Sequence, residues 1–174
     1  KRKKVLAVAI IALFFGAGLA TQGSFVSPYV EFLGLPKISV FFIAYSTAAV
    51  ITRILGSRIA DRVGEENILP WSFVVNAIGY LTLILITNSW QLAVAGFITG
   101  CGHGMIFPSL NALAVRDEPI EIRGKITGTF TGAMDGGMFA GSFLMGFIGD
   151  WLGFTPIFIT TAAILLTCAL AFPI

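Results

Sequence analysis

The sequence predicts an all-α integral membrane protein whose six transmembrane helices form two inverted three-helix repeats. Three observations support this fold class. Hydrophobic residues make up 56% of the 174-residue chain, charged residues only 11%, and the mean hydropathy is +0.91. The apolar residues fall into six long runs, and a short motif recurs at matching places in the two halves of the chain. Soluble domains carry about 25% charged residues, so too few polar side chains are available to cover a water-facing surface.

This composition argues against several classes of protein. A soluble enzyme, a nucleic-acid-binding module, a secreted disulfide scaffold and a disordered chain all need more polar residues or more cysteines than the chain has. Cys101 and Cys168 both lie within apolar runs, and their spacing fits no zinc site. We therefore expect no metal, no cofactor and no nucleic-acid partner. Because the chain opens with Lys1 rather than Met, we expect it to be a fragment of a longer protein.

The first three apolar runs are bounded by basic residues and turn residues. A helix needs about 20 mostly apolar residues to cross ~30 Å of hydrocarbon. Residues 5–29 follow four basic residues and precede the turn Gly34-Leu35-Pro36-Lys37. Residues 38–57 lead into a charged, glycine-containing segment, and residues 68–87 end at Thr87-Asn88-Ser89. Each run is therefore predicted to be one transmembrane helix.

The last three runs have similar boundaries. Residues 91–115 precede a charged connection, and residues 125–148 begin after Arg123 and Gly124. The turn Asp150-Trp151-Leu152-Gly153 separates them from the last run, which extends from residue 155 to the end of the chain. We therefore expect a single six-helix bundle over residues 1–174, with one three-helix repeat in 1–87 and the second in 88–174.

The basic residues predict the orientation, because cytoplasmic segments carry an excess of Lys and Arg. With the first helix starting in the cytoplasm, inner segments carry nine of the eleven basic residues, and outer loops carry only Lys37. The eleventh, Arg53, lies in the second helix near its inner end. An even number of spans puts both termini in the cytoplasm. We expect a bacterial-type plasma (inner) membrane.

A four-residue pattern supports the inverted repeat. Asp61-Arg62-Val63-Gly64 follows the second helix, and Asp150-Trp151-Leu152-Gly153 follows the fifth. The same D-x-x-G thus closes the second helix of each three-helix set, on opposite sides of the membrane. Such inverted repeats are common in secondary transporters, although a chance match is the alternative for so short a pattern.

The segment Gly56-Ser57-Arg58-Ile59-Ala60-Asp61-Arg62-Val63-Gly64 resembles the G-x-x-x-(A)-D-R-x-G loop of major facilitator superfamily transporters. Other segments resemble, in the right order, the seventh to twelfth helices of that family. They include Ser27-Pro28-Tyr29, Arg53-Ile54-Leu55-Gly56, Gly100-Cys101-Gly102-His103-Gly104 and Arg123-Gly124-Lys125.

The resemblance implies the C-terminal six-helix half of a secondary transporter. Such a protein moves a small organic solute by alternating access, with a proton gradient as the expected driving force and drug or metabolite efflux as one expected role. The implied partners are the lipid bilayer, the solute, and either the N-terminal half of the same transporter or a second copy of this chain. The implied protein is not an enzyme and needs no cofactor.

Two departures from the family pattern bear on these expectations. The family loop usually continues with basic residues, whereas this chain has Glu65 and Glu66. Residues 137–146 resemble a degraded antiporter motif in which Ser142 and Met145 replace the expected Pro and Gly. That motif belongs to the family's fifth helix, which the eleventh mirrors, so it does not prove export.

The resemblance assigns a cytoplasmic latch to the loop that contains Gly56, Asp61, Arg62 and Gly64. Gly56 would let the helix approach a neighbour, and Asp61 would accept hydrogen bonds from a helix N-terminus. Arg62 would pair with a carboxylate in the other half, or within this chain. The candidates within the chain are Asp117, Glu118 and Glu121. A solvated, positively charged loop is the alternative.

Glycines recur on single faces of the fourth and fifth helices, where small residues allow close helix packing in lipid. The predicted packing residues are Gly96, Gly100, Gly104, Gly128, Gly132, Gly136, Gly137 and Gly141. Smooth glycine faces would also let helices slide or bend during transport.

Asp135 lies about ten residues into the fifth predicted helix, close to the middle of the bilayer. A lone carboxylate is expensive there, so it is expected to be protonated, paired or facing water. The functional hypothesis is proton coupling. The alternative is a structural carboxyl group that is hydrogen-bonded to a neighbouring helix.

The family's seventh and tenth helices line the central cavity, and this assigns candidate solute contacts. They are Gln22 and Ser24 on the first helix, His103 and Asn111 on the fourth, and Tyr45 beside them on the second. His103 is the only histidine, and a hydrogen-bonded core histidine is the alternative. Few ionisable groups lie on this presumed cavity face, which favours a neutral or weakly charged, partly apolar solute.

Other functions fit the sequence less well. An intramembrane hydrolase needs a nucleophile and a base at one depth, and the chain has one histidine and no G-x-S-x-G motif. Channel signatures and a phosphate-binding loop for ATP are absent. A free-standing six-helix protein that works as a homodimer stays open, as does a non-transport membrane scaffold.

Overall fold

The computed structural model describes residues 2–172, apart from the side chains of residues 2, 3, 57 and 61, and every regular element in this part is an α-helix. The helices are α1 (Arg2–Ser24), α2 (Val26–Phe32), α3 (Ser39–Val63), α4 (Glu65–Leu83), α5 (Ser89–Val115), α6 (Ile120–Leu152) and α7 (Phe154–Leu170). The six predicted runs are therefore all helical, and the first run forms α1 and α2.

The break between α1 and α2 has a local cause. Pro28 has no backbone N–H, so it cannot donate to the carbonyl of Ser24 one turn earlier. The helical path nevertheless continues, because the N–H of Phe25 donates to Thr21 at 3.0 Å and that of Tyr29 to Phe25 at 3.1 Å. Lys4–Phe32 thus forms one apolar stretch of 29 residues.

The segment predicted as a loop at residues 56–64 is helical up to Val63, which corrects the sequence prediction. Gly56, Asp61 and Arg62 all lie within α3, and the turn is made by Gly64 alone at φ +86°. Nothing earlier in this segment breaks the helix, whereas glycine tolerates positive φ without steric strain. The N–H of Gly64 closes the helix by donating to Ala60 at 2.8 Å.

The second D-x-x-G segment also ends at a glycine with positive φ. Gly153 has φ +83°, joins α6 directly to α7, and donates its N–H to Gly149 at 2.9 Å. Both motifs therefore end a long helix at a single left-handed glycine, after which the next helix starts at once. The sequence match corresponds to a structural match at equivalent places in the two predicted repeats.

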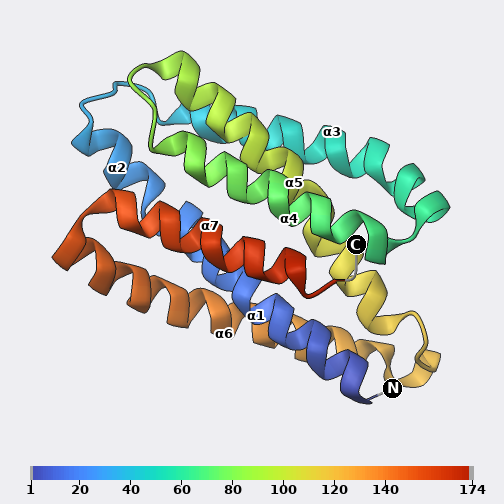
Figure 1. The fold of residues 1–174 in the computed structure, drawn as a ribbon. Helices are drawn as coiled ribbons and strands as arrows, with labels where there is room; N and C mark the ends of the chain where they lie inside the picture. Colours follow the sequence, from blue (N-terminus) through green and yellow to red (C-terminus); the bar gives the residue numbers. More distant parts are fainter. Residues whose placement is uncertain (1, 173–174) are drawn as a thin grey trace.

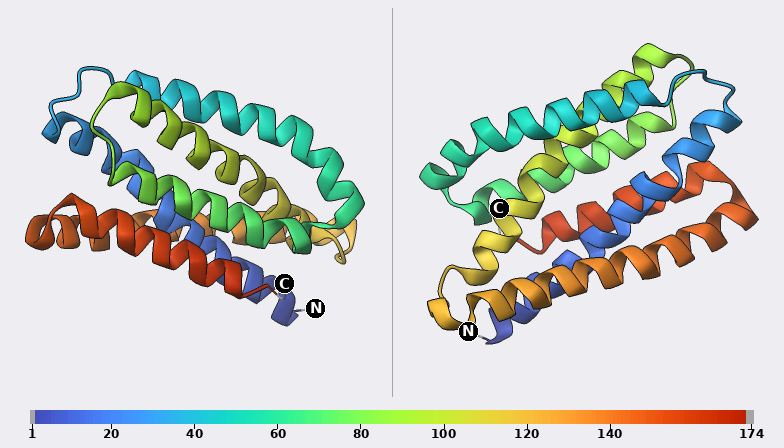
Figure 2. Two further views of the ribbon diagram at one scale, coloured as in Figure 1. Left: turned by 45° about the horizontal axis from the view of Figure 1, so that its top comes forward. Right: turned by 180° about the vertical axis from the view of Figure 1, so that it is seen from behind.

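The helices form two groups (Figures 1 and 2). In one group α5 packs against α3 and α4, and in the other α1 packs against α6 and α7. Contact between α4 and α7 joins the groups. The first helix of each predicted repeat thus packs on the second and third helices of the other repeat. The start of α1 and the end of α7 lie at the same end of the bundle.

Buried polar side chains cross-link the helices. Tyr80 of α4 donates its hydroxyl to the Gly18 carbonyl of α1 at 2.7 Å, and Asn76 donates to the Thr99 carbonyl of α5 at 2.8 Å. The hydroxyls of Thr21 and Thr161 share a hydrogen bond of 2.6 Å between α1 and α7. Such bonds hold helices together in lipid, where no water is available to hydrogen-bond an unpaired polar group.

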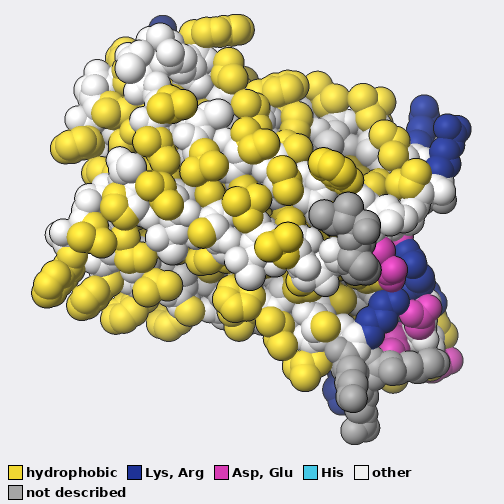
Figure 3. Space-filling view, viewed as in Figure 1, with side chains coloured by type: hydrophobic (Ala, Val, Ile, Leu, Met, Phe, Trp, Pro, Cys, Tyr) yellow, Lys and Arg dark blue, Asp and Glu magenta, His cyan; other side chains and the backbone are white. Residues whose placement is uncertain are grey.

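Apolar side chains cover most of the face seen in Figure 3, and charged side chains gather at the end where α1 starts. By length and apolarity alone, three described stretches qualify to cross a membrane, namely Lys4–Phe32, Ser39–Ala60 and Ser89–Val115. α7 is apolar but has 17 residues. α4 starts with two glutamates, and α6 has a charged first turn and many glycines and threonines, and neither qualifies by the same measure.

Candidate functional site

Three of the predicted solute contacts come together where α1, α3 and α5 meet. The ring of His103 lies 5.5 Å from the ring of Tyr45 and 5.3 Å from that of Phe15, between ring centroids. The Tyr45 phenol also interacts with the side chain of Gln22. We call Gln22, Tyr45 and His103 the polar cluster. It joins one residue from each of three helices near the middle of the bundle.

Close approach of α3 and α5 explains the cluster. Gly100 lies directly against the backbone of Tyr45, and a Cβ on Gly104 would come within 2.6 Å of the Ala49 carbonyl oxygen. Because these glycines have no side chains, the two backbones are nearly in contact. His103, on the adjoining face of α5, is therefore held beside the Tyr45 ring.

Gln22 has an unusual environment within the cluster. It is only 8% exposed, and its Oε1 atom is buried without a hydrogen-bond partner among the described residues. A buried carbonyl oxygen without a donor is unfavourable by about 1–3 kcal/mol. The amide therefore offers an acceptor to any donor that enters the cluster.

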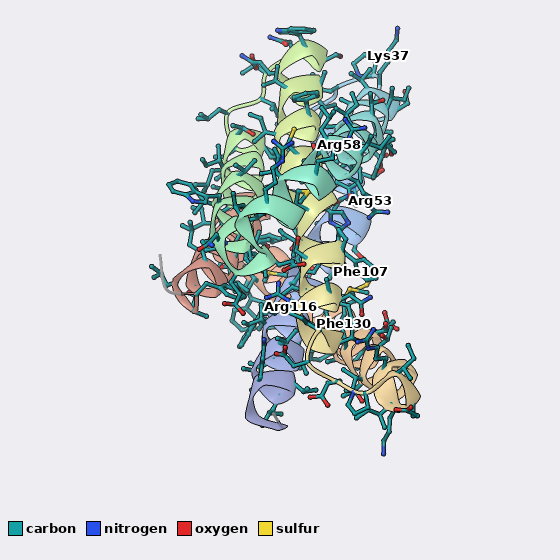
Figure 4. The ribbon with its side chains drawn as sticks, turned by 90° about the vertical axis from the view of Figure 1, so that its right-hand side faces the viewer. Lys37, Arg53, Arg58, Phe107, Arg116 and Phe130 are labelled. Carbon is teal, nitrogen blue, oxygen red and sulfur yellow. The ribbon has the colours of Figure 1, made fainter. Side chains whose placement is uncertain are left out.

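Arg53 is a functional candidate that the site prediction omitted. It lies ten residues before the end of α3, and its side chain is exposed and points away from the bundle (Figure 4). Its positive charge acts on both Tyr45 and His103. The signal was present in the sequence, since an ionisable residue inside a membrane-spanning helix is a functional candidate by default.

A small cavity lies beside Arg53, between α3 and α5. Its volume is about 150 Å³, and Met105 and Pro108 form part of its wall. Glu65 also lines it but forms an ion pair with Arg116. No ion pair of Arg53 is found among the side chains that the structure describes.

Two predicted contacts lie apart from the cluster. Ser24 is exposed at the end of α1, next to the break before α2. The Asn111 Oδ1 atom accepts a hydrogen bond of 3.2 Å from the Thr127 hydroxyl, which links α5 to α6. One turn from Asn111, the rings of Phe107 and Phe130 join the same two helices at 5.6 Å (Figure 4). Asn111 therefore belongs to a helix contact in this structure.

The predicted packing glycines separate into two sets. Gly96, Gly100 and Gly104 lie against the backbone of α3, and Gly137 and Gly141 lie against the backbone of α1. The other set has no atom within 4 Å of where a Cβ would stand: Gly128, Gly132 and Gly136. This second set does not pack within the described chain and leaves a smooth face of α6 open.

Asp135 lies on the open face of α6, beside Gly136. It is exposed and near the middle of the helix. Its carboxylate makes no ion pair with the residues that the structure describes. The open face thus combines a row of glycines with one mid-membrane carboxylate.

The charged end of the bundle differs from the predicted latch. Gly56 contacts the sulfur of Met105, which brings α3 close to α5. Arg62 is exposed and, among the described side chains, forms no ion pair with Asp117, Glu118 or Glu121. The side chain of Asp61 lies outside the described residues, so its capping role stays a prediction.

A different ion-pair network occupies this end. Arg116 pairs with Glu65 and lies 3.9 Å from Glu66, while Lys4 lies 3.6 Å from Glu66 and 2.9 Å from Asp117. The network joins the start of α1, the start of α4 and the end of α5. The two glutamates that depart from the family pattern are therefore engaged within this chain.

Comparison with known families decides what this bundle is. The family model described as Major Facilitator Superfamily matches residues 6–174. The chain belongs to the major facilitator superfamily. It is an integral membrane protein, and members of this superfamily are in general transporters rather than enzymes.

Individual superfamily relatives agree with this assignment. The multidrug resistance protein MdtG of Citrobacter koseri is 31% identical over 170 residues, which are 94% of this chain and 42% of MdtG. The uncharacterised MFS-type transporter YhhS of Escherichia coli O157:H7 is 26% identical over 148 residues, which are 85% of this chain and 36% of YhhS. The chain therefore spans about two fifths of the length of these relatives.

A solved structure has the same fold. The in meso crystal structure of the POT family transporter PepTSo matches with a TM-score of 0.81, over 98% of this chain and 36% of that protein. The sequences are 16% identical, so this likeness concerns the fold alone.

Proposed function

We propose that the full-length protein is a secondary transporter that moves a small organic solute by alternating access, and that this chain is its C-terminal six-helix half. Superfamily membership supports transport, and the length relative to MdtG and YhhS supports half of a larger protein. The name of MdtG as a multidrug resistance protein makes efflux of drugs or metabolites the favoured role.

The open face of α6 carries this proposal. Asp135 is exposed near the middle of a helix that crosses the bundle, with Gly128, Gly132 and Gly136 on the same side. A carboxylate in contact with lipid at this depth is unfavourable by several kcal/mol. The face therefore needs another part of the protein or a water-filled cavity beside it, and the proposed N-terminal six-helix half would supply both.

Asp135 is the proposed proton-coupling residue. In this scheme Asp135 takes up a proton from one side of the membrane and releases it on the other as access changes. Loading and release of one proton would then be tied to the change of access. The proton gradient drives uphill movement of the solute in this scheme, and the open glycine face lets α6 move relative to its partner.

The test compares two aspartates of α6 in the full-length protein. Proteoliposomes loaded with a pH gradient measure uphill movement of ethidium, and solute exchange without a gradient measures the change of access alone. Asp135→Asn should abolish uphill movement and retain exchange, whereas Asp150→Asn, at the exposed end of the same helix, should retain both.

Uphill movement by the Asp135→Asn protein at the wild-type rate would contradict proton coupling through this residue. Loss of both uphill movement and exchange, with the protein still folded, would instead assign Asp135 a structural role. A wild-type protein that moves neither ethidium nor other organic solutes would contradict the transport proposal itself.

A further inference from the structure

We propose that the groove between the starts of α1 and α6 binds one membrane phospholipid whose zwitterionic headgroup carries a primary ammonium, the chemistry of phosphatidylethanolamine. An acyl chain lies along the apolar walls of the groove, Lys125 holds the phosphate, and Glu118 holds the ammonium. The site lies apart from the polar cluster, and it does not depend on the proposed transport function.

The groove opens where the apolar stretch of α1 begins. The starts of α1 and α6 lie side by side at the charged end of the bundle (Figures 1 and 2). The apolar stretch of the first helix starts at Lys4, and its first turns form one wall of the groove. Apolar side chains of α6 form most of the other wall, and the volume between them is about 550 Å³. The groove therefore has an apolar body next to the charged end.

The walls suit an acyl chain better than a helix. Leu6 and Ile122 are 62% and 40% exposed, and Ala9 and Ile126 complete the apolar lining. A helix is about 10–12 Å across, so one turn of it fills roughly 500 Å³. The groove thus has room for about one turn of a helix, whereas a thinner, extended acyl chain can lie along it. This favours a lipid over a segment of the other six-helix half.

The groove also carries two opposite charges. Glu118 and Lys125 both line it, and neither forms an ion pair with a side chain that the structure describes. Nearby charges are already paired, since Lys4 lies 2.9 Å from Asp117. The Arg123 Nε atom donates to the main-chain carbonyl of Glu118 at 2.9 Å, which fixes the turn before α6. The groove therefore offers one anionic and one cationic group to a ligand.

A zwitterionic headgroup matches this pair. Lys125 is exposed in the second turn of α6, and helical spacing puts it on the same face as Ile122 and Thr129. Its apolar stem can lie along the groove while its ammonium reaches the headgroup. A phosphate accepts charge-assisted hydrogen bonds from this ammonium, and the Glu118 carboxylate accepts them from a primary ammonium.

The same pairing excludes two other common headgroups. Phosphatidylglycerol has no cationic group, so its phosphate would lie near an unpaired Glu118 carboxylate. Phosphatidylcholine has a quaternary ammonium, which has no N–H to donate. The two charged side chains therefore select phosphatidylethanolamine.

Three lipids with identical acyl chains test this selectivity: phosphatidylethanolamine, phosphatidylcholine and phosphatidylglycerol. Each is titrated into the purified full-length protein in mild detergent, and native mass spectrometry measures the bound fraction. Wild type should bind phosphatidylethanolamine about two- to fivefold more tightly than either of the others, which is the size expected for a partly exposed ion pair.

Charge variants locate the headgroup. Lys125→Gln should weaken binding of all three lipids about two- to fivefold, because each has a phosphate. Glu118→Gln should remove the preference for phosphatidylethanolamine over phosphatidylglycerol. The matched controls are Lys37→Gln, at the other end of the bundle, and Glu121→Gln, which is exposed in the first turn of α6 but does not line the groove. Both should behave as wild type.

A second pair of variants locates the acyl chain. Ala9→Phe puts a ring into the groove and should weaken binding of all three lipids. Ala7→Phe adds the same ring at an exposed position of α1 that does not line the groove, so it should leave binding unchanged. Melting temperatures without added lipid show whether each variant is folded.

Two results would overturn the site. One is equal affinity of wild type for the three lipids, and the other is a headgroup preference that Glu118→Gln leaves unchanged. If Ala9→Phe unfolds the protein, Lys125→Gln decides in its place, and unchanged lipid binding in that variant contradicts the proposal. A groove filled by the other six-helix half would give that result, because no lipid could then reach Lys125.

Discussion

Two glycines of α6 show how much a single hydrogen atom in place of a side chain matters in this bundle. Gly137 lies directly against the backbone of Leu13 on α1, whereas Gly124, in the second turn of α6, has nothing within 4 Å of where a Cβ would stand. Backbone atoms cannot move aside as a flexible side chain can. The first glycine therefore sets the distance between α1 and α6, and the second does not.

We expect Gly137→Ala to lower the free energy of unfolding of the full-length protein by about 1–3 kcal/mol, because an extra methyl group overpacks a tight contact. Gly124→Ala should be neutral or stabilise slightly, because alanine favours the helix by up to about 1 kcal/mol. Thermal unfolding in mild detergent measures both. Equal melting temperatures for the two variants would mean that α1 and α6 separate more easily than their contact indicates.

Single-residue roles were only partly predictable from the sequence. Helical spacing places Gly128, Gly132 and Gly136 on one face and Gly137 with Gly141 on the next, but it does not say which face a neighbour covers. In the same way, family resemblance pointed to Gln22, Tyr45 and His103, which do lie together. Arg53 was placed near the inner end of its helix and was counted only as a basic residue, not as a site residue.

At the scale of elements, the ion-pair network at the charged end ties helices from both predicted repeats. Arg116 ends α5 and meets Glu65 and Glu66 at the start of α4, while Lys4 links Glu66 to α1. Negative charge also suits the first turn of α4, where free N–H groups and the helix dipole are positive. The network therefore fixes the spacing of three helix ends.

We expect Arg116→Glu to lower the free energy of unfolding by about 1–2 kcal/mol, since exposed ion pairs contribute about 0.2–1 kcal/mol each and repulsion replaces them. Adding Glu65→Arg to the same protein should recover part of the loss. Arg62→Glu, at the same end without an ion pair among the described side chains, is the matched control. Melting temperatures at low and high salt measure the effect.

Salt gives this test its internal check. At about 1 M salt the screening length falls to ~3 Å, so the difference between wild type and Arg116→Glu should shrink. A loss of stability that is independent of salt, and that Glu65→Arg does not recover, would show that Arg116 acts through packing of its stem and not through its charge.

The existence of the helices was predictable, and their ends were less so. Long apolar runs indicated each span because a helix satisfies all its backbone hydrogen bonds within one continuous segment, as lipid requires. The end of α3 was placed at residue 57, but the helix continues to Val63, since Gly64 is the first residue there that adopts positive φ. Composition marks where lipid ends, and a helix often continues past that point.

At the scale of the whole molecule, the two predicted repeats exchange their first helices. α1 packs on α6 and α7, and α5 packs on α3 and α4, so neither set of three helices holds its own core. Inverted repeats place equivalent segments on opposite sides of a membrane. The D-x-x-G match indicated the repeat, but the exchange depends on long-range packing that a four-residue motif does not encode.

The orientation of the molecule follows from its charge distribution. The starts of α1, α4 and α6 lie at the end where charged side chains gather, and the connection between α2 and α3, which contains Lys37, lies at the other end (Figures 1 and 3). Because basic residues are retained in the cytoplasm, we expect the charged end to face the cytoplasm and Lys37 to face outward.

Single cysteines test this orientation in intact cells. In a full-length protein whose native cysteines, including Cys101 and Cys168, are changed to alanine, Lys37→Cys should react at once with a membrane-impermeant maleimide. Glu121→Cys, which is exposed in the first turn of α6, should react only after the membrane is permeabilised. The reverse pattern would place the ion-pair network outside the cell, and labelling of both sites in intact cells would mean that the two ends are not separated by a membrane.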